Sequence, residues 1–219
     1  MPFVSNKEEI KRNRKRENMS YKEEFIEFML SAGALTFGDF TTKSGRKTSY
    51  FINTGSYKTG SQIEKLGEFY AKCIYENMEA GNIPKDINCL FGPAYKGIPL
   101  VITTAIALNQ KYNIDVNYCF NRKEVKDHGE GGSMVGYKLQ DGDKVLMIED
   151  VITAGTAVRE CLPVLQAAAA VKVEALIISV DRMEKGIGEL TATEEIYEEF
   201  GIKTFSIVSV EDIKINQSC

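Results

Sequence analysis

Short runs of apolar residues, each followed by a helical pattern, recur along most of this chain and constrain its fold more than any other feature. INCLFG (87–92), KVLMI (144–148) and ALIISV (175–180) are such runs. Their almost continuous apolar character is typical of strands that are buried on both faces. Strands that alternate with helices predict an α/β fold with a mostly parallel central sheet flanked by helices.

The first part of the chain does not follow this alternation. Ser20 and Glu23 form a capping-box pattern, which predicts the start of a helix. Residues 35–54 are rich in Thr, Phe and Tyr around the turn signal KSGRK, so we expect a hairpin there. This hairpin predicts a small N-terminal cap, or hood, beside the main sheet. A second capping box, at Ser61 and Glu64, predicts the start of the next helix.

The domain boundaries follow from these patterns. Residues 1–19 contain the basic block KRNRKR and are expected to form a disordered tail. Residues 20–219 then form a single domain, with the cap at about 20–60 and the core at about 61–213.

Composition excludes several classes of protein. The net charge is −4 and the sequence pI is about 5.3, which argues against nucleic acid as a partner. No apolar run approaches the roughly 18 residues of a membrane span. The five cysteines form no C-x-x-C pair, and no signal peptide is recognisable. Reduced thiols in the cytoplasm are therefore expected.

Three loops follow predicted strands, and we expect them to meet at one edge of the sheet. They are residues 92–97, 121–137 and 149–156. Ligands of open α/β sheets bind beyond the carboxyl ends of the strands. Residues 121–137 have almost no apolar content and several glycines, so this segment is predicted to be a long mobile loop.

The stretch VLMIEDVITAGTA (145–157) carries the clearest chemistry. Its small-residue loop lies between a strand and a helix, so its backbone amides can bind an anion. Glu149 and Asp150 would repel that anion, but they can accept hydrogen bonds from vicinal sugar hydroxyls. The pattern therefore predicts a sugar phosphate, with a divalent cation favoured near the acids. The alternative interpretation is that the acids cap a helix and the small residues serve packing.

Several stretches together resemble one family in order and spacing. They are KSGRKTSYFIN (43–53), FGPAYKGIPL (91–100), CFNRKEVKDHGEGG (119–132), VLMIEDVITAGTA and ISVDRMEKG (178–186). These stretches resemble the type I phosphoribosyltransferases, and RKEVKDHGEGG resembles the branch that acts on orotate. The resemblance implies transfer of phosphoribose from 5-phosphoribosyl 1-diphosphate to orotate. It also implies Mg²⁺ and a homodimer in which the Arg122 loop reaches the neighbouring site.

The resemblance also assigns roles to individual residues. Catalytic roles fall on Lys96, Lys123, Lys126, His128 and Asp150. Binding of the diphosphate substrate falls on Lys43, Tyr95, Lys96, Arg122, Lys123, Lys126, His128, Glu149, Asp150, Val151, Ile152, Thr153, Ala154, Gly155, Thr156 and Ala157. Binding of orotate falls on Lys43, Phe51, Ile52, Thr153 and Arg182. Mg²⁺ is expected mainly on substrate and water, near Asp150.

Two departures from the family pattern and two rival functions remain. Many relatives carry two phenylalanines where this chain has Phe51 and Ile52, and close bacterial relatives often carry Asp where it has Glu149. One rival function is transfer to a different base. The other is a regulatory protein that keeps the fold and touches nucleic acid through residues 11–16.

Overall fold

The computed structural model describes residues 19–41, 47–126 and 132–217. It divides the chain into two compact units. The larger unit is Tyr57–Val210, and the smaller one contains the described residues up to Ser56 together with those from Glu211 onward. The expected division into a cap of about 20–60 and a core of about 61–213 within one functional domain stays a prediction.

The smaller unit contains the predicted helix and hairpin. Helix α2 (Tyr21–Ser31) begins after Ser20, and both hydrogen bonds of the predicted capping box with Glu23 are present. Strands β1 (Leu35–Thr41) and β2 (Lys47–Ile52) pair antiparallel and are followed by a short 3-10 turn, Thr54–Ser56. Helix α7 (Val210–Gln217), which the sequence patterns did not predict, is joined to α2 by an ion pair between Lys22 and Asp212 at 2.9 Å.

The larger unit is built on a six-stranded sheet, and the prediction of a mostly parallel sheet is confirmed. The strand order is β5-β4-β3-β6-β7-β8, in which only β5 runs antiparallel to its neighbour. The strands are β3 (Cys89–Gly92), β4 (Asn117–Lys126), β5 (Gly132–Gly136), β6 (Lys144–Val151), β7 (Lys172–Asp181) and β8 (Lys203–Ser209).

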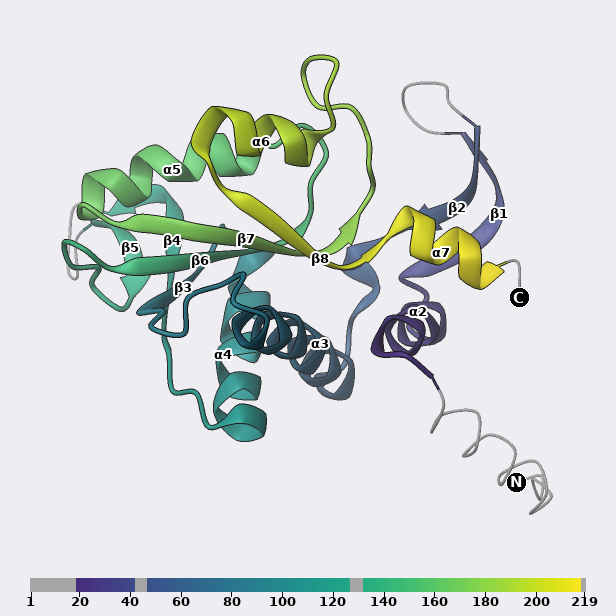
Figure 1. Cartoon of the computed structure of the whole chain (residues 1–219), viewed down its shortest axis with the longest axis horizontal. Coiled ribbons are helices and arrows are strands. Elements are labelled where there is room, and N and C mark those ends of the chain that lie inside the picture. Colours follow the sequence, from purple (N-terminus) through teal and green to yellow (C-terminus); the bar gives the residue numbers. More distant parts are fainter. Residues whose placement is uncertain (1–18, 42–46, 127–131, 218–219) are drawn as a thin grey trace. The chain divides into compact units, whose positions relative to one another are not determined.

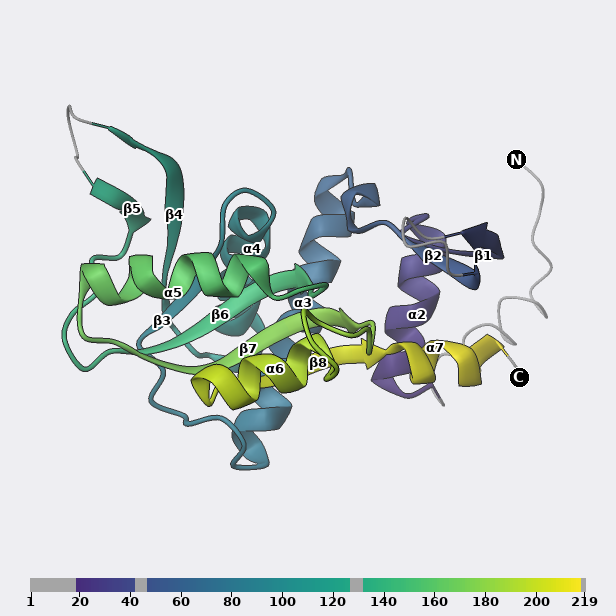
Figure 2. The same cartoon turned by 90° about the horizontal axis from the view of Figure 1, so that it is seen from above.

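Helices cover both faces of this sheet (Figure 1 and Figure 2). Helices α3 (Gly60–Glu79) and α4 (Gly97–Tyr112) pack on one face. Helices α5 (Thr156–Ala168) and α6 (Ala192–Phe200) pack on the other, where their apolar side chains join those of the strands in one core. Because both faces are covered, the central strands have no polar alternation, which explains their continuous apolar runs.

The described parts of residues 121–137 include strands that their polar composition did not predict. Strand β4 continues to Lys126, and Gly132–Gly136 form β5, which pairs antiparallel with β4 with an irregular register between Asn121 and Lys126. Residues 127–131 lie outside the described residues, so the prediction of a loop stays a prediction there. Strand β5 is the edge strand of the sheet, where one side has no neighbouring strand and polar residues are tolerated.

The start of α3 also differs from the prediction. Its N-cap is Thr59, whose side chain accepts a hydrogen bond from the Gln62 amide while the Gln62 side chain bonds back to the Thr59 amide. Ser61 and Glu64, which were expected to form the capping box, lie inside the helix. Two overlapping Ser/Thr-x-x-Glu/Gln patterns were present, and only the backbone conformation selected between them.

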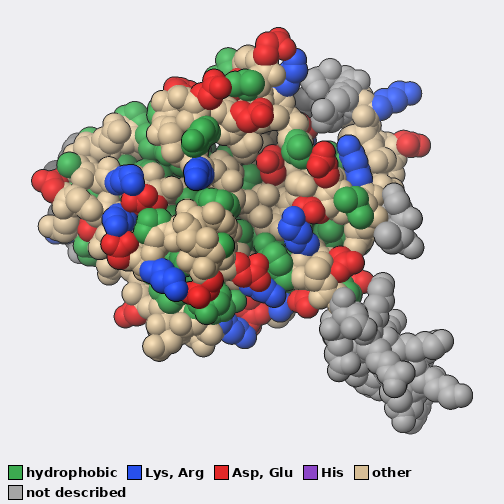
Figure 3. Space-filling view, in the orientation of Figure 1, with side chains coloured by type: hydrophobic (Ala, Val, Ile, Leu, Met, Phe, Trp, Pro, Cys, Tyr) green, Lys and Arg blue, Asp and Glu red, His purple; other side chains and the backbone are tan. Residues whose placement is uncertain are grey.

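The surface of the larger unit carries charges of both signs. Figure 3 shows Lys and Arg side chains interspersed with Asp and Glu side chains over the face that it displays. Within residues 19–41, 47–126 and 132–217, none of the helices combines the length and the apolar character that a membrane span requires.

Candidate active site

The carboxyl ends of three parallel strands meet at one edge of the larger unit's sheet. Strand β6 lies between β3 and β7, and Val151 at its end pairs with Val180 of β7. The segments after these strands therefore start next to one another: residues 93–96 after β3, 152–155 after β6 and 182–191 after β7. This is the edge at which the sequence placed the ligand.

Glu149 and Asp150 lie near the carboxyl end of strand β6, and not in the loop that follows. Each is only 7% exposed. The ammonium group of Lys96 lies 2.8 Å from Oδ2 of Asp150, so the loop after β3 is joined to the acid pair. Oδ1 of Asp150 accepts a hydrogen bond from the amide of Val151 at 2.7 Å. Lys96 and Asp150, to which the resemblance assigned roles in the same reaction, are therefore in contact, and those roles stay a prediction.

The two carboxyl groups differ in their electrostatics. Burial and the nearby charge of Asp150 raise the pKa of Glu149 to about 7. In the folded protein Glu149 therefore holds its proton to a higher pH than it does in an unfolded chain. A protonated carboxyl group can also donate a hydrogen bond, so the pair can present both a donor and an acceptor to a ligand.

The raised pKa of Glu149 predicts a stabilising substitution. The folded state binds more protons than the unfolded state between the unfolded pKa of 4.5 and the folded pKa of about 7, so stability falls as pH rises through that window. We expect Glu149→Gln to raise Tm by several degrees at pH 8 and by much less at pH 5, as measured by thermal denaturation.

The control for that experiment is Glu194→Gln. Hydrogen bonds from the amide and the hydroxyl of Thr191 lower the pKa of Glu194, so its carboxylate stabilises the fold above its unfolded pKa. This variant should therefore lose stability at pH 8. An unchanged Tm of Glu149→Gln across the pH range would contradict the raised pKa.

Two buried hydroxyl groups fix the backbone beneath the acids. Tyr70 of α3 donates a hydrogen bond to the carbonyl oxygen of Glu149 at 2.7 Å, and Ser179 of β7 donates one to that of Asp150 at 2.6 Å. Tyr70 is fully buried and Ser179 is 2% exposed. Because both carbonyl groups are held from outside the strand, the direction of the acid pair is set by α3 and β7 as well as by β6.

The loop after β6 has the features of an anion site. Gly155 is the N-cap of α5 and has a φ of 70°, and no side chain caps the helix. The first-turn amides and the positive end of the helix dipole are thus presented at the loop. Thr153 and Thr156 are exposed, so their hydroxyl groups add donors there, while Ile152 is buried and anchors the loop in the core.

The loop after β3 is attached to β4. The amide of Ala94 donates to Oδ1 of Asn121 at 2.8 Å, and the Lys123 ammonium lies 5.4 Å from the centre of the Tyr95 ring. Tyr95 is 66% exposed. Tyr95, Lys96 and Lys123, which the sequence assigned to the diphosphate, therefore come from neighbouring segments, and Arg122 precedes Lys123 in β4.

Arg182 follows β7 at the same edge. One nitrogen, Nη2, lies 3.0 Å from Oε1 of Glu184. Its Nε is buried and has no hydrogen-bond partner among the described residues. A buried donor without a partner is costly, so an acceptor supplied by a ligand would stabilise this arrangement.

Some predicted residues are not brought into this arrangement. Lys43 and His128 lie outside the described residues, as does the side chain of Lys126. Phe51 and Ile52 belong to β2 in the smaller unit. Their contacts with orotate stay a prediction.

Sequence patterns did not identify several residues that organise the site. Tyr70 appeared only as part of an apolar helix stripe, and Ser179 as part of a strand. Arg159, four residues after Gly155, donates to the carbonyl of Ala154 at 2.5 Å. Its position one turn into the helix after an anion loop was the only signal in the sequence. For Asn121, Tyr70 and Ser179 no local pattern exists, because their partners are remote in sequence.

Metal ligation by the protein alone is limited. Across the described parts of the chain, no group of three or more His, Cys, Asp or Glu side chains is arranged to hold an ion. The acid pair supplies two carboxyl groups at most. A hard cation that takes most of its oxygen ligands from a substrate and water fits such a site.

Comparison with known proteins agrees with this geometry. The phosphoribosyl transferase domain model matches residues 53–211. Orotate phosphoribosyltransferases of Clostridium beijerinckii and Clostridium acetobutylicum are 59% and 56% identical, over 89% and 88% of this chain and 84% of each relative. The crystal structure of orotate phosphoribosyltransferase from Francisella tularensis has a TM-score of 0.76 at 40% identity, covering 87% of both chains.

Proposed function

Because this chain belongs to the orotate phosphoribosyltransferases, we propose roles in that reaction for the residues at the carboxyl edge of its sheet. The enzyme transfers the phosphoribosyl group of 5-phosphoribosyl 1-diphosphate to orotate, which yields orotidine 5′-monophosphate and pyrophosphate in pyrimidine biosynthesis. The observation that carries the assignment is the buried acid pair, Glu149 and Asp150, placed directly before the Gly155 loop.

The phosphoribosyl group occupies this loop. The 5′-phosphate lies on the amides and hydroxyl groups of residues 153–157, at the start of α5. The ribose hydroxyl groups lie on Glu149 and Asp150, one at a carboxylate acceptor and one at the second carboxyl group. Lys96 contacts Asp150 at 2.8 Å, which places its ammonium group beside the acid pair and within the site proposed for the leaving diphosphate.

Charge stabilisation is the main contribution of the protein to catalysis. As the bond from the ribose carbon to pyrophosphate lengthens, negative charge grows on the pyrophosphate oxygens and positive charge on the ribose. Lys96 and Lys123, with Lys126, His128 and the partner-directed Arg122, stabilise the leaving oxygens. Asp150 stabilises the cationic ribose from its other side.

Mg²⁺ is the proposed cofactor. Asp150 and Glu149 are the carboxyl groups that would hold it, with the remaining ligands from the diphosphate, the ribose hydroxyl groups and water. When bound, the ion neutralises charge on the diphosphate and fixes its geometry. The scarcity of clustered protein ligands among the described residues agrees with a metal that arrives with its substrate.

Orotate binds through its carboxylate. The guanidinium group of Arg182 offers a planar pair of donors, and its partnerless Nε is one of them. Thr153, Lys43, Phe51 and Ile52 complete the proposed contacts with the base. Backbone amides at Phe51 and Ile52 would make those contacts independent of the Ile52 side chain.

The assignment of Arg182 is tested with Arg182→Lys. Lysine keeps the charge but loses the fork, and the loss of one charge-assisted hydrogen bond should raise KM for orotate by roughly 10- to 100-fold. KM for 5-phosphoribosyl 1-diphosphate should stay within about twofold, since the change is local. Steady-state kinetics with Mg²⁺ and each of orotate, uracil, adenine and hypoxanthine give the measurement.

The base panel contains its own control. Uracil lacks the carboxylate, so any residual use of uracil should be the same in the wild type and in Arg182→Lys. An unchanged KM for orotate would remove Arg182 from the base site. Wild-type activity with adenine or hypoxanthine comparable to that with orotate would reverse the proposed specificity.

A homodimer with a shared active site is proposed for Arg122. Mixed refolding of Asp150→Asn with Arg122→Ala tests it, because a hybrid dimer would contain one site with both residues intact. Random pairing makes half of the dimers hybrids, so about one quarter of wild-type activity should return from two nearly inactive parents. If Arg122 acts in its own subunit, mixing restores no activity.

We also place the enzyme in the cytoplasm, with no nucleic acid or membrane partner.

A further inference from the structure

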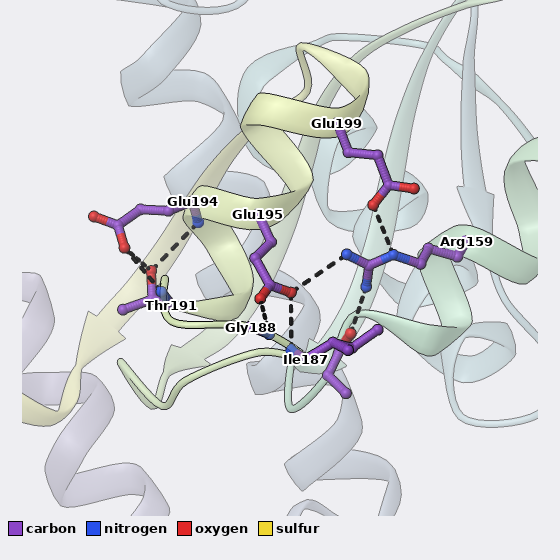
Figure 4. A network of polar contacts seen from close by, with 8 residues as sticks. Arg159, Ile187, Gly188, Thr191, Glu194, Glu195 and Glu199 are labelled. Atoms are coloured by element: carbon purple, nitrogen blue, oxygen red, sulfur yellow. Dashed lines mark hydrogen bonds and ion pairs between the residues drawn. The ribbon is translucent and has the colours of Figure 1, made fainter.

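Arg159 lies one turn into α5, after the loop that we propose to hold the phosphate, and each of its three guanidinium nitrogens has a partner (Figure 4). Nη1 donates to the carbonyl oxygen of Ala154 at 2.5 Å, and Nε to Glu199 at 2.8 Å. Nη2 lies 3.4 Å from Oε2 of Glu195. Two carboxylates neutralise this cation, so it has no uncompensated charge to offer a phosphate.

Glu195 of α6 connects the same guanidinium to the segment after β7. Its carboxylate accepts the amide of Ile187 at 2.9 Å and the amide of Gly188 at 2.5 Å (Figure 4). The side chain is 13% exposed, and a Cβ built on Gly186 would lie 2.1 Å from Oε2. Glycine at 186 thus allows the backbone to approach the carboxylate. The hydrogen bonds from these two backbone amides lower the pKa of Glu195, so its carboxyl group stays ionised.

The orientation of the Ala154 carbonyl matters for an anion site. A loop binds phosphate when its amides point inward, and its carbonyl groups must then point away, because carbonyl oxygens repel an anion. Arg159 fixes the carbonyl before Gly155 through its hydrogen bond to that oxygen. In this way Arg159 can affect phosphate binding without touching the phosphate.

We propose that Arg159 and Glu195 are positioning residues that couple the phosphate loop to the segment that carries Arg182. The contacts run from the Ala154 carbonyl through Arg159 and Glu195 to the amides of Ile187 and Gly188. The binding of both substrates, 5-phosphoribosyl 1-diphosphate and orotate, thereby depends on the same two side chains. The base-side half of this inference rests on the proposed role of Arg182.

The matched pair Glu195→Gln and Glu199→Gln tests the coupling. Both carboxylates contact Arg159, but only Glu195 also holds the loop, and Glu199 is 47% exposed. A glutamine at 195 has one acceptor oxygen and cannot receive both amides. We expect Glu195→Gln to raise KM for 5-phosphoribosyl 1-diphosphate and for orotate by roughly 5- to 20-fold each, from one lost hydrogen bond to a charged group. Glu199→Gln should leave both within about twofold.

A double-mutant cycle separates coupling from simple loss of stability. Arg159→Lys should reproduce the rise in KM for 5-phosphoribosyl 1-diphosphate, and the double variant with Glu195→Gln should be no worse than the poorer single variant. Equal kinetics of the Glu195 and Glu199 variants would overturn the proposal. A fall in Tm with both KM values unchanged would do the same.

The design also separates this inference from the role of Arg182. If Arg182→Lys leaves KM for orotate unchanged while Glu195→Gln raises KM for 5-phosphoribosyl 1-diphosphate, the phosphate-loop half stands and the base-side half is wrong. If Glu195→Gln does not fold, Arg159→Lys alone decides the phosphate-loop half, because its kinetics are read without the Glu195 variant.

Discussion

Asp150→Asn should lower kcat by roughly 10²–10³-fold, in line with the loss of one well-placed electrostatic group. Asparagine keeps the shape of the side chain and the oxygen that accepts the Val151 amide, so the backbone should not move. It removes the negative charge that holds Lys96 at 2.8 Å and that we propose to face the cationic ribose. The measurement is kcat at saturating substrates, together with binding of 5-phosphoribosyl 1-diphosphate by calorimetry.

Asp143→Asn is the control for charge loss in a buried aspartate. Asp143 is also 7% exposed and immediately precedes the same strand, but it lies at the opposite end, where it accepts the amide of Gln140. This variant should lose some stability and keep its turnover. If Asp150→Asn bound its substrate normally and turned over as fast as the wild type, the electrostatic role of Asp150 would be refuted.

Gly155→Ala should reduce affinity for 5-phosphoribosyl 1-diphosphate by at least about tenfold, because it distorts the backbone that we propose to bind the phosphate. A Cβ at this position would lie 2.7 Å from Nη1 of Arg159 and 3.0 Å from Cδ1 of Ile196. The backbone φ of Gly155 is 70°, and this positive value adds a conformational cost for alanine. Either the loop or Arg159 must shift, and both shifts rotate the Ala154 carbonyl.

Gly201→Ala separates the clash from the conformational cost. Gly201 ends α6 with a φ of 69°, and a Cβ there would meet nothing within 4 Å. It should cost about 1 kcal/mol of stability with unchanged kinetics. Gly155→Ala should show a rise in KM that Gly201→Ala lacks. The same KM for both variants would mean that the loop does not bind the phosphate.

Comparison of predicted and observed elements shows which parts of the fold are local. Ser20 and Glu23 mark the start of α2 because a capping box needs only neighbouring residues. The part of β4 from Asn121 onward and the edge strand β5 were missed because their sequences are mostly polar or glycine and carry no clear alternation. Helix α7 was missed for a related reason, since it is short and has no strong apolar stripe.

The candidate site divides in the same way. Glu149 and Asp150 were identifiable because they follow a predicted apolar strand and precede a small-residue loop, and Lys96 and Arg182 because they lie in stretches that resemble the family. Parallel strands then bring the segments that carry these residues together at one edge of the sheet. The residues that hold these side chains and their backbone in place were not identifiable from the sequence. Tyr70 contacts a residue 79 positions away, Ser179 one 29 positions away and Arg159 one 36 positions away.

By itself, the sequence determined the α/β class and the strand, acid pair and small-residue loop of residues 145–157, since these depend on hydrophobic periodicity and on residues adjacent in the chain. Only the tertiary structure decided the strand order, the raised pKa of Glu149 and the link from Ala154 through Arg159 to Glu195. Burial and hydrogen bonds between remote residues exist only after the chain has folded, so no local pattern can encode their geometry.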